Sequence, residues 1–521
     1  MKVKNSFRLL VVLMSGFIAA CGGSSSEQTA VTGSIFAGPV NGASVTVKNT
    51  SGTTIARPVT TGSDGTYSIK ILNTDLSSDL VFEANGGTFT DEATGTAGVA
   101  AGLFSAYITG GTLGTGSSVH VTPFTTIVQK VVTAGKTKTE AETAFNAAFG
   151  FIPDSALAPT DATNPATGAT EEQKLAGFRV AVFSQLAKDL GESQSHLLAH
   201  LPEDLADDYI LNGLPGHLAE DIGNKFETAF INFLANSNNH SGLTPDKIGT
   251  LPFAKTALTT NYKVEYIPGM MSATQGKTAF KIRVSNISGG TAVSGATIAL
   301  TPTMYMSTMS HGSPAGACTE SATAGTYDCN MYYLMAGGSG MGYWKLQVGV
   351  NGENAVFYPA VGMAMGTDTV SATLRLSTDT YPGMMGASVR PYYVFKDALT
   401  AGMGGTYTFN VFIGARETMM SHPALYTGLS MNLGAFTATS VAVSISTDGG
   451  ATWVPMIEDA TYHGRFSVAG LTGFSSGVAG TIYVKLTING NDYVDNATGD
   501  ATAVGAHTYA TFTVTPGAMG M

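Results

Sequence analysis

The hydrophobic period of this chain changes twice, and these changes limit the folds open to it. Between about Val119 and Leu258 apolar residues recur every three or four positions, as in TEAETAFNAAFGF and EEQKLAGFRVAVFSQLAKDLG, which predicts amphipathic helices. On both sides of this stretch, apolar and polar residues alternate in short runs separated by glycine-rich turns, which predicts antiparallel strands. A chain of 521 residues is too long for one ordinary core, so we expect several domains, most of them β.

The first residues predict an exported lipoprotein. A basic segment, MKVKNSFR, precedes the apolar run LLVVLMSGFIAA, which is too short to span a bilayer, and Ile18-Ala19-Ala20-Cys21 follows. This pattern resembles the bacterial lipobox, which implies cleavage before Cys21 and lipidation of that cysteine. Because Gly22 rather than aspartate comes next, the sorting pattern of such lipoproteins implies the outer membrane, on its periplasmic or its exterior face. GGSSSEQ then predicts a flexible tether.

Charge and motifs exclude several classes of function. The formal net charge is −11, and no basic run is interleaved with aromatic residues, which argues against nucleic acid as a partner. The sequence has no Gly-x-Ser-x-Gly elbow, no phosphate-binding glycine loop, no HExxH and no CxxCH. We therefore expect a protein that is not an enzyme. Its predicted partners are the membrane, through the lipid at Cys21, and an envelope protein of unspecified identity.

The segment after the tether predicts a β-sandwich. Apolar residues alternate at Val45 and Val47 and again from Tyr67 to Ile71, with an Asp64-Gly65 turn before the second run. The Gly-Ala-x-Val-x-Val strand and the Asp-Gly-x-Tyr hairpin resemble the carboxypeptidase-regulatory-like domain. This resemblance covers about 80 residues and implies a spacer without chemistry of its own.

Two histidines of the helical segment are spaced as metal ligands. His196 and His200 lie one helical turn apart on one face, with Glu203 nearby, and a pair at this spacing can ligate a metal. The sequence shows no glutamate directly after the first histidine and no clear third ligand. A partly exposed helical surface is therefore the simpler interpretation.

Methionine is confined to the C-terminal half of the chain. Residues 22–261 contain none, whereas residues 262–521 contain 19. Thioether sulfur is a soft ligand that selects Cu(I), which predicts copper as the cofactor. The alternative is that these side chains serve only for adaptable packing and for contact with the many tyrosines nearby.

The candidate copper ligands surround two Met-Ser-His segments. Alternate residues of a strand face one side, so Met304 and Met306 can present two thioethers together, and Met309 and His311 repeat that spacing. His311 would also allow Cu(II) in a different ligand set. The second segment either forms a second site or converges with the first on a shared one. The predicted metal ligands are Met304, Met306, Met309, His311, Met335, Met419, Met420 and His422.

Two cysteines remain once Cys21 carries lipid. In an exported chain Cys318 and Cys329 are expected to form a disulfide between two strands. The alternative is that both are thiolate ligands of copper.

The methionine-rich half repeats short landmarks in the same order, which predicts two related β-sandwiches. The repeated landmarks are Pro-Gly-Met-Met at 268–271 and 382–385, Met-Ser-His at 309–311 and 420–422, Thr-Tyr at 326–327 and 461–462, and Asn-Gly at 351–352 and 489–490. The second copy also contains Ser446-x-Asp448-x-Gly450-x-Thr452-Trp453, which matches the Asp-box turn of sialidase propellers and is interpreted as structural.

The first copy resembles the YtkA-like domain family. The resemblance lies in Met309-x-His311-x-x-Pro314, Gly325-x-Tyr327 and Gly342-x-Trp344. It implies a small immunoglobulin-like β-sandwich of an exported bacterial protein associated with copper handling. The cysteine pair and an extra Gly-Ser-Gly-Met before Trp344 depart from the family pattern.

Together these patterns predict a multidomain, mainly β protein with immunoglobulin-like β-sandwiches separated by a small α-helical domain. The expected function is copper binding, as Cu(I), at the cell envelope; the alternative is a structural or adhesive surface protein. The expected segments are a signal peptide at 1–20, a tether at 21–28, a carboxypeptidase-regulatory-like sandwich at 29–112, a helical domain at 119–258, a YtkA-like sandwich at 262–380 and a second methionine-rich sandwich at 381–521.

Overall fold

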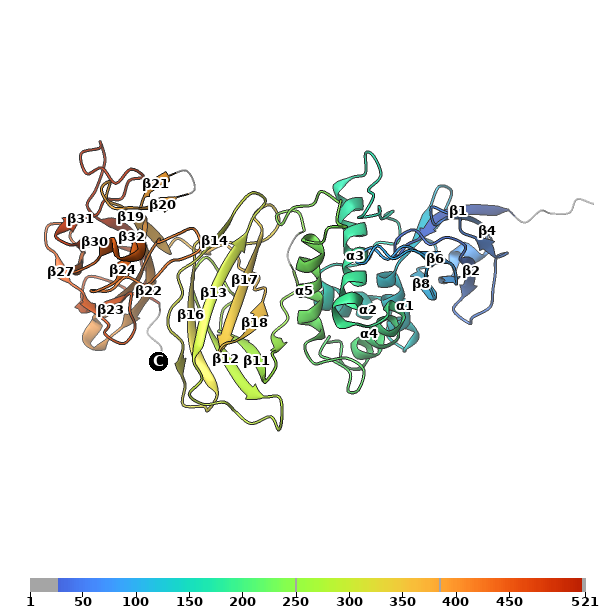
Figure 1. Ribbon diagram of the computed structural model, residues 1–521, viewed down its shortest axis with the longest axis horizontal. Helices are drawn as coiled ribbons and strands as arrows, with labels where there is room; N and C mark the ends of the chain where they lie inside the picture. Colours follow the sequence, from blue (N-terminus) through green and yellow to red (C-terminus); the bar gives the residue numbers. More distant parts are fainter. Residues whose placement is uncertain (1–26, 249–250, 384–385, 518–521) are drawn as a thin grey trace, which may run out of the picture.

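The chain is a mainly β, multidomain protein in which immunoglobulin-like β-sandwiches are separated by a group of helices, so the predicted fold class is confirmed (Figure 1). The computed structural model describes residues 27–248, 251–383 and 386–517. Cys21 and the Met384-Met385 pair lie outside these described residues. Within them, no helix is both long and apolar enough to cross a bilayer.

The N-terminal sandwich consists of two small sheets. In β4 the side chains of Tyr67, Ile69 and Ile71 are buried, and in β2 those of Val45 and Val47 are buried, so both predicted alternations are confirmed. One sheet contains β4 (Thr66–Leu72), β1 (Gln28–Ile35) and β9 (Ser118–Val121). The other contains β3 (Val59–Thr60), β2 (Ser44–Asn49), β5 (Leu80–Asn85) and β8 (Leu103–Ile108), and β6 (Thr88–Phe89) pairs with β7 (Val99–Ala100) in a separate ribbon.

Five α-helices follow and pack on this sandwich through one continuous apolar core. Helix α1 begins after Thr122, whose side chain accepts a hydrogen bond from the Thr125 N–H as an N-cap, and a proline occupies the first helical position. Thr126 of the same helix accepts a hydrogen bond from the Ser105 N–H of β8 at 2.9 Å. The helices are α1 (Pro123–Thr133), α2 (Lys138–Phe149), α3 (Glu171–Leu190), α4 (Gln194–Asp208) and α5 (Ile222–Leu234).

The two methionine-rich sandwiches have the same strand order. The first pairs a five-stranded sheet with a four-stranded one, the second pairs two five-stranded sheets, and each strand of the first sandwich has a counterpart at the same place in the second. The first contains β10 (Thr256–Leu258), β11 (Tyr262–Pro268), β12 (Gly276–Asn286), β16 (Thr326–Tyr333) and β15 (Thr319–Glu320) against β14 (Ser310–Gly312), β13 (Ile298–Tyr305), β17 (Tyr343–Val350) and β18 (Glu353–Phe357).

The second sandwich repeats this order and adds a C-terminal strand beside β30. One sheet contains β19 (Ser371–Leu374), β22 (Tyr392–Ala401), β23 (Tyr407–Ala415), β29 (Arg465–Leu471) and β28 (Ile457–Glu458). The other contains β27 (Val454–Pro455), β26 (Val441–Ser446), β30 (Gly480–Ile488) and β31 (Asn491–Asp492), and β32 (Ala510–Val514) pairs with β30. Two ribbons complete the domain, β20 (Thr380–Gly383) with β21 (Gly386–Val389) and β24 (Ser430–Met431) with β25 (Phe436–Thr437).

The Asn-Gly landmarks occupy equivalent hairpins in the two sandwiches. Asn351 and Gly352 join β17 to β18 with φ of 49° and 91°, and Asn489 and Gly490 join β30 to β31 with φ of 52° and 77°. Positive φ at both central residues is the requirement of the two-residue hairpin turn that favours Asn-Gly. These landmarks therefore belong to a true structural repeat.

The Met-Ser-His landmarks, in contrast, are not equivalent. The first leads into β14, whose counterpart in the second sandwich is β27, whereas His422 lies directly after β23, the counterpart of β12. The two segments match in the sequence because they occur in the same order among the landmarks. In the structure they lie in different connections of the same fold.

The Asp-box folds into a self-contained turn, in agreement with its structural interpretation. The Ser446 hydroxyl and the Thr452 N–H donate to Asp448 Oδ1 at 2.7 and 3.0 Å. These hydrogen bonds, together with one from the Thr452 hydroxyl, lower the pKa of Asp448 to about 2.

Candidate metal centre at the junction of two sandwiches

His311 lies on the inner face of the first methionine-rich sandwich. In the sheet register it stands opposite Met304, which in turn stands opposite Trp344. Residues directly opposite each other in antiparallel strands project to the same face. Met304, His311 and Trp344 are therefore neighbours on one face, and all three side chains are buried.

The imidazole of His311 faces a thioether. Its Nδ1 lies 2.7 Å from the carbonyl oxygen of Gly312, which can only accept a hydrogen bond, so Nδ1 carries the hydrogen. Nε2 then presents its lone pair, and it lies 3.4 Å from Sδ of Met335. Burial lowers the pKa of His311, which favours the neutral ring. Two electron-pair donors thus face each other.

Trp344 fixes the positions of both donors. Its Nε1–H donates to the Met335 carbonyl at 3.0 Å, and its ring meets the His311 ring edge-on with centroids 5.5 Å apart. Trp344 is fully buried, so the indole acts as a rigid support. This tryptophan belongs to the Gly-x-Trp landmark of the sequence.

The second Met-Ser-His segment reaches the first across the junction. The Gly312 N–H donates to the Met419 carbonyl at 2.8 Å. A Cβ on Gly312 would stand 2.1 Å from the Met420 carbonyl oxygen and 3.3 Å from His422 Nδ1, so only glycine fits there. The structure therefore places the two Met-Ser-His segments in contact at this junction.

His422 is next to the centre but has no free lone pair. The Arg416 Nε–H donates to His422 Nε2 at 3.3 Å, which places the ring hydrogen on Nδ1, and Nδ1 is buried without a hydrogen-bonding partner in the described structure. Burial, the Arg416 guanidinium and nearby His311 lower the pKa of His422 to about 3. In this arrangement His422 supports the centre rather than presenting a ligand atom.

The other predicted ligands are placed less favourably. Met304 is completely buried, and Met306 packs against the same core. Met309 and Met420 are 44% and 47% exposed, and Met419 contributes its carbonyl group to the contact with Gly312. The structure therefore brings together His311 and Met335, with Met304 on the same face.

Cys318 and Cys329 form a disulfide, which ties the segment before β15 to β16. Disulfide sulfurs are not thiolates, so in this state the cysteines do not belong to the ligand set.

A buried carboxylate joins the two sandwiches beside the centre. Asp397 of β22 accepts a hydrogen bond from the Tyr332 hydroxyl of β16 at 2.6 Å and forms ion pairs with Lys277 at 2.7 Å and Arg465 at 3.1 Å. The Tyr332 ring also stacks on Phe412, with centroids 3.9 Å apart. These contacts hold the two Met-Ser-His segments in one arrangement.

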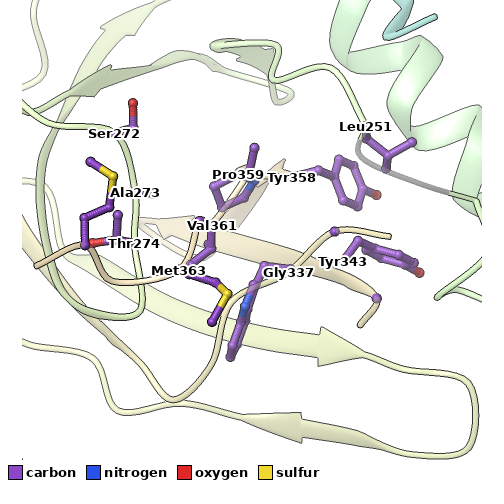
Figure 2. A pocket seen from close by; sticks show the side chains of 16 residues that line it. Leu251, Ser272, Ala273, Thr274, Gly337, Tyr343, Tyr358, Pro359, Val361 and Met363 are labelled. Atoms are coloured by element: carbon purple, nitrogen blue, oxygen red, sulfur yellow. The ribbon is translucent and has the colours of Figure 1, made fainter. Parts of the chain in front are cut away.

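A cavity of about 590 Å³ lies where the first methionine-rich sandwich meets the segment after the helices (Figure 2). Its lining is mostly apolar and includes Leu251, Tyr343 and Tyr358, and Trp344 forms part of its wall. Figure 2 shows the thioether of Met363 directed into this space. Sequence reasoning missed the cavity because its lining comes from separate segments with no shared motif.

The histidine pair of the helical segment gains a third member. His196 and His200 lie on α4 as predicted, and the structure brings His217 beside them from the following loop. The spacing within the helix could not show this contact.

Comparison with known proteins adds little. No protein-family model and no curated protein matches the chain. Among solved structures it is similar to a chimeric titin Z1Z2-Z1Z2 tandem carrying a GRGDS peptide from fibronectin, with 11% identity, 50% of this chain and 98% of that chain covered, and a TM-score of 0.12. Titin domains A168-A170 are 8% identical, with 46% of this chain and 95% of that chain covered and a TM-score of 0.12. S. aureus TarS is 7% identical, with 67% of this chain and 59% of that chain covered and a TM-score of 0.13.

These TM-scores are too low for the similarity to indicate a shared fold or function. The sheets of the chain itself define its class, a multidomain protein of tandem immunoglobulin-like β-sandwiches.

Proposed function

We propose that this chain is an exported lipoprotein that binds Cu(I) between His311 and Met335 and takes part in copper handling at the cell envelope. The observation that carries the proposal is the contact between a neutral imidazole lone pair and a thioether sulfur at 3.4 Å.

The spacing of the two atoms suits a shared metal ion. With metal–nitrogen and metal–sulfur bonds of about 2.0 and 2.3 Å at a tetrahedral angle, the two ligand atoms stand about 3.5 Å apart. A thioether and an imidazole together favour a soft ion, and Cu(I) is the soft ion such ligands select. Met304, on the same face, supplies a further thioether.

The cellular setting rests on the N-terminal sequence. The lipobox ending at Cys21 supports export and anchoring by lipid at the outer membrane. We further propose that the protein is not an enzyme, because its sequence carries none of the catalytic motifs named above and the proposed centre has a binding role.

The test is a Cu(I) titration of the full mature chain, with Cys21 replaced by serine, against a competing chromophoric chelator. Met335→Leu is the critical variant, because this volume-conserving change costs less than about 1.5 kcal/mol of stability and removes the sulfur. We expect it to abolish tight binding. Met403→Leu is the matched control, because Met403 is 94% exposed and should leave binding unchanged. Equal affinities of wild type and Met335→Leu would refute the assignment.

A structural or adhesive role is the second candidate. The sandwiches and helices follow one another along the long axis of the molecule, which suits a spacer that holds a partner away from a surface (Figure 1). Met304 and Met331 are completely buried in an apolar core, as packing residues are. No Cu(I) binding by the wild-type chain, with a lower melting temperature for Met304→Ala, would favour this candidate.

A further inference from the structure

We propose a second metal site, formed by His196, His200 and His217, that binds a divalent ion of the Zn²⁺ and Cu²⁺ class. One ligand atom from each histidine lies within 4.8 Å of the others. The His200 ring stands 4.6 Å from that of His196 and 4.0 Å from that of His217, between centroids. The site is independent of the Cu(I) centre, because it lies in the helical domain.

The helix and the loop hold these three rings in place. α4 begins at an N-cap formed by Ser193, which accepts a hydrogen bond from the His196 N–H, so the two helical histidines lie in its first two turns. The loop that carries His217 is closed by paired hydrogen bonds between Leu214 and Leu218. It is tied to α4 through the buried side chain of Asp204, which accepts from the Gly213 N–H at 3.1 Å.

Carboxylates stand behind the two helical histidines. Glu203 lies 2.9 Å from Nδ1 of His200, which leaves Nε2 of that ring to bind an ion. Glu192 lies 3.4 Å from Nδ1 of His196, an atom shielded from solvent and without a hydrogen bond in the described structure. A carboxylate that accepts from the outer nitrogen of a ligand histidine orients the ring and makes it a better donor.

The local charge also favours a cation. Imidazole ligands add no charge to a metal site, and the carboxyl groups of Glu192 and Glu203 stand at the edge of this one. The nearby ammonium of Lys130 is directed to the Leu198 carbonyl at 2.7 Å. The ring of His217 is exposed and makes no hydrogen bond within the described chain, so the cluster opens to solvent on that side.

The donor set selects the kind of ion. Imidazole nitrogen suits ions of borderline softness such as Zn²⁺ and Cu²⁺, whereas no thioether is available for Cu(I), since residues 22–261 contain no methionine. Three protein ligands leave a fourth position open for water or an external ligand, as in zinc sites that exchange their fourth ligand.

The test titrates the full mature chain, with Cys21 replaced by serine, separately with Zn²⁺ and Cu²⁺ against a chromophoric chelator, with the visible spectrum of bound Co²⁺ as a second readout. We expect one ion per chain and an ion-dependent rise in melting temperature. His217→Ala should weaken binding by at least about 100-fold and leave the ion-free melting temperature unchanged. Glu203→Gln should weaken it by about tenfold, as loss of an outer partner does.

The control variants are His463→Ala, which removes an exposed histidine stacked on Tyr426, and Met335→Leu, which alters the Cu(I) centre alone. Both should bind Zn²⁺ as the wild type does. Absence of saturable binding of either ion, or binding that His217→Ala leaves unchanged, would overturn the site. Failure of the chain to bind Cu(I) at His311 and Met335 would not count against the three-histidine site.

Discussion

Protonation of His422 should destabilise the folded chain as the pH falls. The side chain is 7% exposed and faces the Arg416 guanidinium and the His311 ring, and its pKa in the folded state is lowered to about 3. In the unfolded chain the pKa returns to about 6.5. Below that pH the unfolded state therefore binds a proton that the folded state does not take up until about pH 3, so stability is lost as the pH falls through this window.

The size of the effect follows from the two pKa values. One pKa unit corresponds to about 1.4 kcal/mol, and at pH 5 the unfolded histidine is protonated while the folded one is still neutral. Between pH 7 and pH 5 His422 should therefore cost the fold about 2 kcal/mol. The pKa of His311 is also lowered by burial, so it contributes a loss of the same sign.

The measurement is urea unfolding at pH 7 and pH 5 for the wild type and for His422→Gln. Glutamine keeps an oxygen that can accept from the Arg416 Nε–H and does not titrate, while His311 and the carboxylates remain in both proteins. The wild type should lose about 2 kcal/mol more than the variant over this pH interval. An equal loss in both proteins would show that His422 is not held neutral in the way described.

Two further predictions concern the sandwiches. Asp397→Asn should lower the free energy of unfolding by about 2 kcal/mol, less than the loss of a fully buried ion pair, because Lys277 and Arg465 are 25% and 36% exposed and regain water. It should also speed hydrogen exchange of the Gly312 amide, and unchanged exchange would contradict a role of Asp397 in holding the junction. Replacing both Cys318 and Cys329 by serine removes a disulfide that closes a loop with a sequence separation of 11. The free energy of unfolding, measured in urea under oxidising conditions, should fall by about 3 kcal/mol. An unchanged free energy would mean that the loop is ordered without the disulfide.

Local features of the fold could be predicted from the sequence. The burial of Tyr67, Ile69 and Ile71 follows from alternation within one strand, and the start of α1 follows from Thr122 and the proline after it. In each case the residues that decide the structure are close together in the chain. Such signals need no knowledge of the partner elements.

The candidate centre could be predicted only in part. His311 and Met335 could both be predicted from their residue types. No sequence pattern indicates the role of Arg416, because this side chain acts on His422 only once β23 has folded and the two Met-Ser-His segments are in contact. The contact of Gly312 with Met419 joins residues far apart in the chain. His217 was missed for the same reason, since it reaches α4 from an irregular loop.

The unequal positions of the two Met-Ser-His segments also say something about the history of the chain. Duplication of a sandwich that already carried such a segment would leave both copies in the same connection, yet one leads into β14 and the other follows β23. Simple duplication of one Met-Ser-His segment therefore does not account for both of them.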